Sequence, residues 1–361
     1  MRAMMYITFK NGAAAGAAGA VLATVGQADA GAYGCIQDGF VGFAGKLPTA
    51  GLNGNLERHT ILNMQIQSNH AGRMLGKPRL LILGCGDVGT RIVRILRGRY
   101  RIFAVTTQRE HMQALRDAGA IPLLANLDQP ATLWRLARLA QTVLHLAPPQ
   151  PDDTVDRRTR HLTAILPERT TLVYVSTSGV YGDCNGAWVD ETRPVRPRNA
   201  RAVRRVDAER TLRGWARRSG SRLAIVRVPG IYAADRLPLE RLRKGTPALI
   251  AADDVYTNHI HADDLARIVV AAMRRLQPQR IYHAVDDSDM KMADYFDAVA
   301  DVYALPRPPR LPRAQLQEQV TPAMWSFLTE SRRLSNRRLK TELGVRLLYP
   351  TVFAGMVANS R

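Results

Sequence analysis

The sequence is short of cysteine, of aromatic side chains and of long apolar runs. The three cysteines among its 361 residues, Cys35, Cys85 and Cys184, are too few and too irregularly spaced for a disulfide framework or a zinc site. No stretch approaches the roughly 20 consecutive apolar residues that span a membrane. These absences exclude a disulfide-stapled module and a transmembrane protein, and a reducing, cytoplasmic location is expected.

Acidic residues are also scarce, with 31 Asp and Glu against 51 Lys and Arg and a formal net charge of +20. A protein this basic could bind nucleic acid or an acidic membrane surface. However, the arginines are scattered through helical segments instead of forming one stripe, and aromatic residues make up only 6%. We therefore expect neither a nucleic acid nor a membrane as partner, and a phosphate-bearing small molecule would use only a few of these charges.

Residues 1–73 differ in composition from the rest of the chain. Residues 13–30 form an Ala/Gly-rich run, and the sequence that follows shows no apolar periodicity. One interpretation is a signal peptide cleaved after Ala28-Asp29-Ala30, although its middle contains little Leu, Ile or Val. The favoured interpretation is a disordered extension or a start codon assigned too early, because Met74 stands five residues before a clear first strand.

A strand, a glycine-rich turn and a helix are predicted from Arg79 onward. Arg79 to Leu83 is a short apolar run typical of a buried parallel strand. The segment that follows reads Gly84-Cys85-Gly86-Asp87-Val88-Gly89 and leads into apolar residues at helical spacing. The three glycines permit, in order, a tight turn, close approach to a pyrophosphate and close packing of helix on strand. This context predicts a Rossmann-type dinucleotide site.

The second predicted strand, Ile102 to Thr106, should end over the adenosine ribose. An NAD-specific site places Asp or Glu there to accept a hydrogen bond from the ribose 2′-hydroxyl. Here the chain reads Thr106-Thr107-Gln108-Arg109 and has no carboxylate before Glu110. Hydroxyls and a guanidinium suit a 2′-phosphate, so NADP is the expected cofactor and NAD the second choice. Alternatively, Arg109 is simply solvated at a helix start.

Four further apolar runs continue the alternation of strands with helix-patterned segments. They cover residues 121–124, 142–146, 172–175 and 223–228. This alternation indicates an α/β fold, a Rossmann-type doubly wound parallel sheet. The loops after the third and fourth strands contribute Asn126, Leu127, Ala147 and Pro148 to the expected cofactor site.

Two regions are expected within the folded part of the chain. Residues 74–235 are predicted to form the dinucleotide-binding domain. Residues 236–361 are predicted to form a smaller, mostly helical C-terminal substrate lobe, from which the segment of about 255–286 returns to the Rossmann sheet.

From about Met74 onward the motifs resemble the short-chain dehydrogenase/reductase superfamily, in its extended, epimerase/dehydratase-like branch. After the glycine turn, the motifs that carry the resemblance are VYVSTSGVYGD at 173–183, RVPGIY at 227–232, NHIHADDLA at 258–266 and YHAVDD at 282–287. The resemblance implies that Pro229, Gly230 and Ile231 lie beside the nicotinamide.

In that branch a Ser or Thr, a Tyr and a Lys perform the hydride-transfer chemistry, with the Tyr as general acid/base. The resemblance assigns Thr177 to the hydroxyl position. Arg201, 24 residues later, stands where the Tyr belongs, and Arg205 stands where the Lys belongs, while Glu209 is retained. A guanidinium stays protonated, with a pKa above about 12, so Arg201 cannot exchange a proton as a phenol does. Arg205 could still supply charge or bind the ribose.

Other groups are candidates for the missing acid. Tyr181 could lie near the nicotinamide, or it could pack as the family's usual Val-Tyr-Gly tyrosine. His259 or His261 could contact the substrate, or serve structurally while Asp263 or Asp264 caps the following helix. No set of His, Cys, Asp and Glu shows metal-ligand spacing.

The sequence thus predicts an atypical NAD(P)-binding oxidoreductase or epimerase-like enzyme that lacks the standard Tyr/Lys pair. Its substrate is expected to be a small carbonyl compound, a sugar or a nucleotide sugar. The alternative is a redox-silent NADP(H)-binding sensor or partner-binding protein. The oligomeric state, a homodimer among the options, stays open.

Overall fold

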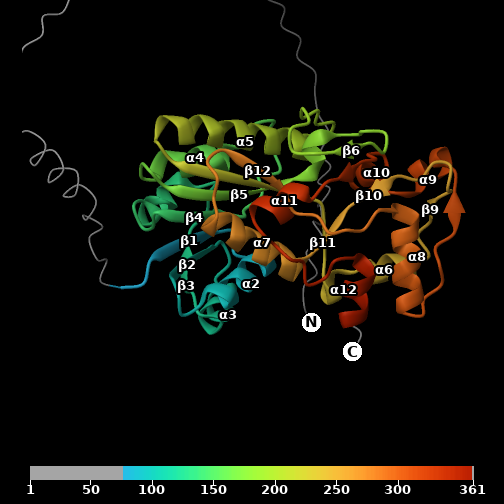
Figure 1. Ribbon diagram of the computed structural model, residues 1–361, viewed down its shortest axis with the longest axis horizontal. Helices are drawn as coiled ribbons and strands as arrows, with labels where there is room; N and C mark the ends of the chain where they lie inside the picture. The colour runs from blue at the N-terminus through green and yellow to red at the C-terminus, as the bar shows by residue number, and fades with distance from the viewer. Residues whose placement is uncertain (1–75, 360–361) are drawn as a thin grey trace, which may run out of the picture. The chain divides into compact units, whose positions relative to one another are not determined.

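Seven strands form one parallel sheet at the centre of the fold (Figure 1). The computed structural model describes residues 76–359, and the extension predicted over residues 1–73 lies outside the described residues. In spatial order the strands are β12 (Arg280–His283), β7 (Arg222–Val228), β5 (Thr171–Thr177), β4 (Thr142–His145), β1 (Arg79–Leu83), β2 (Arg101–Thr106) and β3 (Ile121–Leu124). Every neighbouring pair in this sheet is parallel, which confirms the predicted Rossmann-type fold.

Helices cover both faces of the sheet, because successive side chains of a strand point to opposite faces. In β1, Leu80 and Ile82 face one helical layer and Leu81 and Leu83 face the other. The first layer contains α2 (Asp87–Leu96), α3 (His111–Ala118) and α7 (Ala262–Arg274), and the second contains α4 (Arg157–Ile165) and α5 (Ala200–Arg218). Figure 1 shows α4 and α5 above the sheet and the other three helices below it.

The C-terminal region is a mixture of short helices and very short strands. Its helices are α6 (Leu239–Arg243), α8 (Met292–Val302), α9 (Arg313–Gln319), α10 (Pro322–Leu328), α11 (Arg337–Glu342) and α12 (Val352–Asn359). The paired short strands are β8 (Gly230–Tyr232) with β11 (His259–His261), β9 (Ala248–Leu249) with β14 (Arg310–Leu311), β10 (Tyr256–Thr257) with β13 (Met290–Lys291), and β6 (Trp188–Val189) with β15 (Arg333–Leu334). Before the helices of this region, single 3-10 turns occur at η1 (Pro130–Thr132), η2 (Trp134–Leu136), η3 (Ser178–Tyr181) and η4 (Ala234–Arg236).

A separate apolar core holds part of this C-terminal region together. It joins α6, α8 and α12 through residues such as Leu242, Phe296, Val299 and Met356. Within the returning segment of about 255–286, β12 alone is hydrogen-bonded into the seven-stranded sheet, whereas β10 and β11 pair with short strands outside it.

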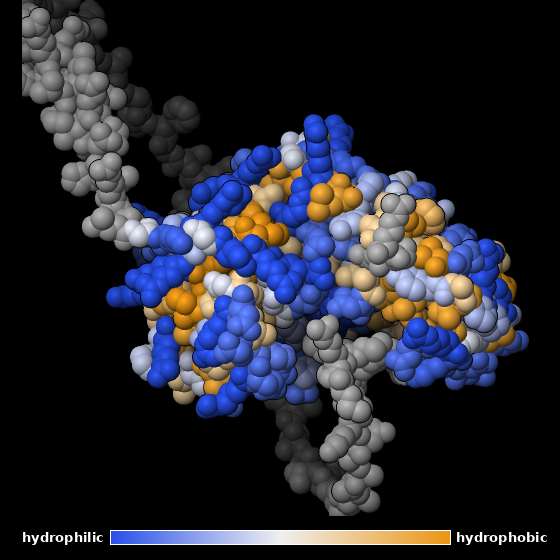
Figure 2. All heavy atoms as spheres, turned by 90° about the horizontal axis from the view of Figure 1, so that it is seen from below, coloured by the Kyte–Doolittle hydropathy of each residue, from blue (hydrophilic) through white to orange (hydrophobic). Residues whose placement is uncertain are grey.

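Hydrophilic side chains cover much of the face in Figure 2, with small groups of hydrophobic residues between them. The most exposed large apolar side chains of the described residues come from separate elements, among them Trp134, Trp188 and Phe353. Within residues 76–359 no helix is both long and apolar enough to cross a membrane.

Candidate functional site

The glycine turn lies where the order of strands reverses. β1 lies between β4 and β2 in the sheet. The connection after β1 leads to β2 on one side, and the connection after β3 leads to β4 on the other, which opens a crevice at the carboxyl ends of the strands. Gly84 directly follows β1 and has a φ of +74°, and a Cβ at this position would lie 2.6 Å from the backbone N and Cα of Ala147. Glycine is therefore required here both by the backbone angle and by the approach of the loop after β4.

Gly86 and Gly89 have different surroundings. Gly86 is the N-cap of α2, and a Cβ there would meet nothing within 4 Å, so the turn is open above the first N–H groups of the helix. At Gly89 a Cβ would lie 2.9 Å from the Cys85 Sγ, which shows how closely helix and turn pack. A cradle that is open at its second glycine and closed at the first and third fits a dinucleotide pyrophosphate.

The remaining residues of the turn are held by neighbours. Cys85 is buried, and burial raises the pKa of its thiol to about 12, so it stays protonated. The Asp87 carboxylate, in the first turn of α2, accepts from Arg91 Nε at 2.9 Å and from Arg236 at 3.2 Å. Arg91 in turn pairs with Asp263, so ion pairs link the turn to α7 and to the segment after β8. Val88 is half-buried against the core.

The loop after β2 presents a hydroxyl and a cation. Thr106 Oγ1 accepts from the backbone N–H of Gln108 at 3.1 Å. Arg109 is exposed, and no described residue forms an ion pair or side-chain hydrogen bond with it. The end of β2 therefore carries an uncompensated guanidinium and no carboxylate before Glu110.

The loops after β3 and β4 are tied together by one arginine. Arg158 binds both carboxylate oxygens of Asp128 and also donates to the Pro148 carbonyl at 2.9 Å. This pairing lowers the pKa of Asp128. Asn126 Oδ1 accepts from the Asp128 N–H at 2.9 Å, and the Leu127 carbonyl is 2.8 Å from His161 Nδ1. These bonds fix both loops at the same edge of the sheet as the glycine turn.

The segment Pro229-Gly230-Ile231 follows β7 and enters β8. Its backbone pairs with β11, and a Cβ at Gly230 would lie 3.2 Å from the His259 ring. These residues therefore lie at the carboxyl end of β7, two strands away from β4 in the sheet.

Thr177 ends β5 and is partly exposed. Its Oγ1 accepts from the Gly179 N–H at 3.2 Å and so caps η3. A Cβ at Gly179 would contact Thr177 and would lie 3.9 Å from Ala202 Cβ in the first turn of α5. The hydroxyl predicted from the motif therefore lies beside the start of the helix that carries Arg201 and Arg205.

Arg205 is oriented by β5, where its Nη1 donates to the Tyr174 hydroxyl at 3.0 Å and to the Val175 carbonyl at 2.7 Å. Arg201 is more exposed, and its guanidinium lies 4.7 Å from the Phe327 ring centroid. Partial desolvation and the nearby guanidiniums, Arg205 foremost, lower the pKa of Arg201. Neither side chain pairs with a carboxylate of the described residues.

Tyr181 is only 1% exposed and belongs to a buried network. Its hydroxyl accepts from Arg227 at 2.7 Å and lies 2.6 Å from His283 Nε2. Burial raises the pKa of Tyr181 to about 12. These contacts favour the second interpretation offered by the sequence, in which this tyrosine packs structurally.

The same network explains the retained Glu209. This buried carboxylate accepts two hydrogen bonds from Arg227, at 3.1 and 2.7 Å, and one from the Ser176 hydroxyl at 2.7 Å. Glu209 therefore locks α5 onto β5 and β7 and so fixes the position of Arg201 and Arg205. The role of Arg227 was missed from the sequence, where nothing pairs it with a residue 18 positions earlier.

The prediction for the cap of α7 was wrong. His261 is the N-cap and accepts from the Asp263 N–H at 3.2 Å, because its imidazole reaches the first turn. Asp264 instead accepts from the N–H groups of Leu348 and Tyr349, and Asp263 pairs with Arg91. His259 is buried, which lowers its pKa to about 3, so its imidazole stays neutral near pH 7. In the described part of the chain, no three His, Cys, Asp or Glu side chains could hold a metal ion.

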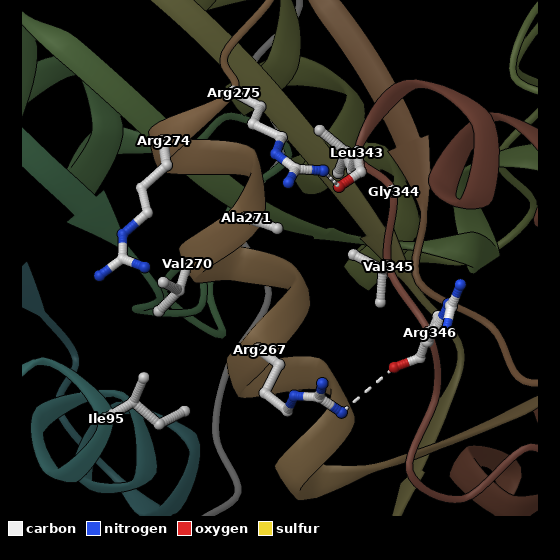
Figure 3. Close-up of a pocket in the computed structure, with 10 residues that line it drawn as sticks. All are labelled: Ile95, Arg267, Val270, Ala271, Arg274, Arg275, Leu343, Gly344, Val345 and Arg346. Atoms are coloured by element: carbon white, nitrogen blue, oxygen red, sulfur yellow. Dashed lines mark hydrogen bonds between the residues drawn. The ribbon is translucent and has the colours of Figure 1, made fainter.

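A separate groove of about 270 Å³ runs along α7 (Figure 3). Figure 3 shows Arg275 directed at the Leu343 carbonyl and Arg267 directed at the Arg346 carbonyl, and each forms a hydrogen bond there. Crossover helices run antiparallel to the strands, so the end of α7 lies at the edge of the sheet opposite the glycine turn. This groove therefore lies outside the candidate site, and two of its arginines anchor the segment after α11.

With this geometry in place, comparison with known proteins identifies the class. Residues 80–284 match the family described as the NAD dependent epimerase/dehydratase family, and the chain belongs to this family. No curated protein matches the sequence.

Solved structures extend the comparison. A functionally unknown conserved protein from Silicibacter pomeroyi is 32% identical over 79% of this chain and 98% of its own, with a TM-score of 0.67. The UDP-glucose 4-epimerase of Thermotoga maritima, solved with UDP-glucose, is 16% identical over 77% of this chain and 96% of its own, with a TM-score of 0.63. The Thermus thermophilus UDP-glucose 4-epimerase, solved with NAD, is 20% identical over 78% and 99%, with a TM-score of 0.60. At these identities the two epimerases show the fold alone.

Proposed function

We propose that this chain is an NADP(H)-dependent oxidoreductase or epimerase-like enzyme that works without the Tyr/Lys pair. The observation that carries the proposal is the glycine turn, in which Gly84 packs against Ala147 while Gly86 leaves open space above the start of α2. Residues Gly84 to Gly89 would hold the pyrophosphate, and Pro229 to Ile231 would flank the nicotinamide. Asn126, Leu127, Ala147 and Pro148 would line the cofactor between these ends.

The preference for NADP over NAD rests on the end of β2. Arg109 is exposed without a counter-charge, and Thr106 offers a hydroxyl. A 2′-phosphate would gain a charge-assisted hydrogen bond from Arg109, whereas the carboxylate that an NAD ribose prefers is missing. The carboxylate after β3, Asp128, is neutralised by Arg158.

The chemistry is divided among the chain's own residues. A dinucleotide held by the glycine turn would supply the hydride donor or acceptor. Thr177 orients the substrate oxygen through its hydroxyl, and Arg205, held by Tyr174 and Val175, supplies positive charge beside it or holds the ribose. When a carbonyl carbon gains hydride, its oxygen gains negative charge, which a fixed guanidinium stabilises without proton transfer. The proton then comes from solvent, because Tyr181 is buried and Arg201 stays charged.

Carbonyl compounds, sugars and nucleotide sugars are the substrate classes that we propose. The T. maritima epimerase binds UDP-glucose, and this chain shares its fold. The alternative is a redox-silent NADP(H) sensor or partner-binding protein, which the lack of a proton-donating side chain at position 201 favours.

Cofactor choice is tested by titrating the full-length protein with NADPH and NADH and following fluorescence. We expect NADPH to bind more tightly, and Arg109→Gln to weaken NADPH binding about tenfold with NADH binding unchanged. Arg94→Gln, on the exposed side of α2, is the matched control and should leave both affinities unchanged. Tighter binding of NADH by the wild-type protein would overturn the NADP assignment and leave NAD.

Turnover is tested by following NADPH oxidation with carbonyl compounds and sugar nucleotides. We expect turnover with at least one class, and Thr177→Val to lower kcat more than it raises KM. NADPH binding without turnover of any compound would support the redox-silent alternative.

A further inference from the structure

We propose that Arg201 and Arg204 bind an oxyanion carried by the substrate, so that the substrate is an acid or a phosphate ester with its anionic group beside the reacting carbon. This inference rests on the proposed function and specifies its substrate class. We call Arg201, Arg204 and Arg205 the α5 arginine cluster. Because Arg201 is three positions before Arg204 and four before Arg205, its side chain is a helix-surface neighbour of both at the start of α5.

The α5 arginine cluster lacks counter-charges. No carboxylate of the described residues pairs with any of its three members. Arg204 donates only to the Asp153 carbonyl, at 3.0 Å, and its buried Nε has no hydrogen-bond partner in the described part of the chain. Glu330, whose charge acts on Arg201, is buried and already pairs with Arg332 at 2.9 Å. The Glu330 carboxylate is therefore already engaged by Arg332 and does not form an ion pair with the cluster.

The position of the cluster lowers the stability of the folded protein. Cations near a helix N-terminus oppose the helix dipole, and the first turn of α5 contains no acidic residue. Asn199 caps the helix by accepting from the Ala202 N–H at 2.9 Å, so the helix start needs no guanidinium for its own hydrogen bonds. Crowded like charges at the positive end of a helix do not stabilise the fold, whereas an incoming anion would be attracted by both the cluster and the dipole.

Arg201 has its whole guanidinium available for an anion, and Arg204 has its Nε available. Arg205 is committed to Tyr174 and Val175, but Arg201 makes no hydrogen bond to a described residue and lies against Phe327. A guanidinium presents a rigid fork that matches carboxylate or phosphate oxygens, and an aromatic face pre-orients it.

The anion would lie next to the reaction centre and not at a distant subsite. Thr177 contacts the start of α5 through the turn at Gly179. Beside the cluster, a cavity of about 180 Å³ is lined by Arg198, Asn199, Trp325, Ser326, Thr329 and Glu330. A neutral sugar would leave the cluster without a partner.

The test uses full-length protein saturated with NADP⁺, so that cofactor phosphates already occupy the glycine turn. Calorimetric titration with malonate, and separately with inorganic phosphate, is performed at constant ionic strength. We expect at least one of them to bind, and Arg201→Gln and Arg204→Gln each to weaken binding about tenfold. Arg217→Gln, at the exposed far end of the same helix, is the control and should bind as the wild type does.

The two titrations identify the chemical class of the oxyanion. Tighter binding of malonate indicates a carboxylate, and tighter binding of phosphate indicates a phosphoryl group. No binding, or equal binding by all four proteins as an adventitious ion only, would overturn the inference. Thermal melting confirms that each variant is folded. If the wild type fails to bind NADP⁺, the proposed function fails, and the same anion titrations without cofactor still decide the inference.

Discussion

Gly84 and Gly86 are the same residue type two positions apart, yet they are needed for different reasons. Gly84 is required by the fold, because its φ is positive and its α-hydrogen faces the backbone of Ala147. Gly86 has open space where a side chain would stand. The sequence predicted a role for each glycine from the motif, but only the structure separates the one that serves folding from the one that faces the ligand.

The first prediction concerns Gly84. Gly84→Ala should lower the free energy of unfolding by at least about 2 kcal/mol, since it combines a positive φ with a Cβ 2.6 Å from Ala147. Urea unfolding measures this loss. A variant as stable as the wild type would show that the turn relaxes more easily than its geometry indicates.

Tyr181 supplies a second residue-scale prediction. Tyr181→Phe removes the hydroxyl that Arg227 and His283 contact and leaves buried polar atoms unpaired. The free energy of unfolding should fall by about 1 to 3 kcal/mol, while the NADPH affinity of the folded protein stays the same. Unchanged stability combined with lost turnover would instead identify Tyr181 as the missing acid.

Much of the candidate site could be predicted at this scale from motif spacing alone. The positions of Thr177, Arg201 and Arg205 follow from counting along the chain. The burial of Tyr181 could not be predicted, because it depends on Arg227 and His283, which are 46 and 102 residues away in the sequence.

At the scale of elements, strands with continuous apolar runs were the most predictable. The structure confirms β1 and β3 with the predicted bounds, and β7 begins one residue earlier than predicted. Turn residues flank these runs on both sides, so their continuous hydrophobicity distinguishes them from the surrounding sequence. The two-residue strands of the C-terminal region carry no such signal, because tertiary contacts alone pair them.

The helix α5 gives an element-scale prediction. Arg201→Gln should raise the free energy of unfolding by about 0.5 kcal/mol, because it removes a cation from the positive end of the helix dipole and from the vicinity of Arg205. Arg217→Gln, in the last turn, should not raise it, because a cation there interacts favourably with the dipole. If both variants lose stability equally, the cluster contributes to folding and its cost has been misjudged.

For the whole molecule, buried histidines control the response to acid. Burial lowers the pKa of His145, His259 and His283 to about 3 each. In the unfolded chain they take up protons near pH 6.5, so the unfolded state binds more protons between about pH 6.5 and 3. Their contribution to stability is complete above pH 6.5 and is lost as the pH falls.

Asp286 acts in the opposite direction. Burial raises its pKa to about 7, so the folded state holds a proton that the unfolded chain releases above about pH 4. The destabilisation by three histidines exceeds the stabilisation by one aspartate. The free energy of unfolding should therefore fall by a few kcal/mol as the pH is lowered from 6.5 to 5. Urea unfolding at pH 7.5, 6 and 5 measures this change, and stability that stays level or rises toward pH 5 would contradict it.

The overall architecture could be predicted because a strand, a glycine turn and a helix follow one another in the order typical of this fold. Further strands and helices then alternate, and parallel strands bring their carboxyl ends to one edge of the sheet. The ion pairs that join distant segments could not be predicted. Arg158 binding Asp128 and Glu209 binding Arg227 depend on which helix packs over which strand.

The central claim is that the open glycine turn binds a dinucleotide, and one titration tests it most directly. Full-length wild type and Gly86→Val are titrated with NADPH, and the melting temperature of each is measured. Because a Cβ at Gly86 meets no protein atom within 4 Å, the variant should melt as the wild type does but bind NADPH at least a hundredfold more weakly. Equal NADPH binding by the two proteins, or no binding by the wild type, would contradict the account.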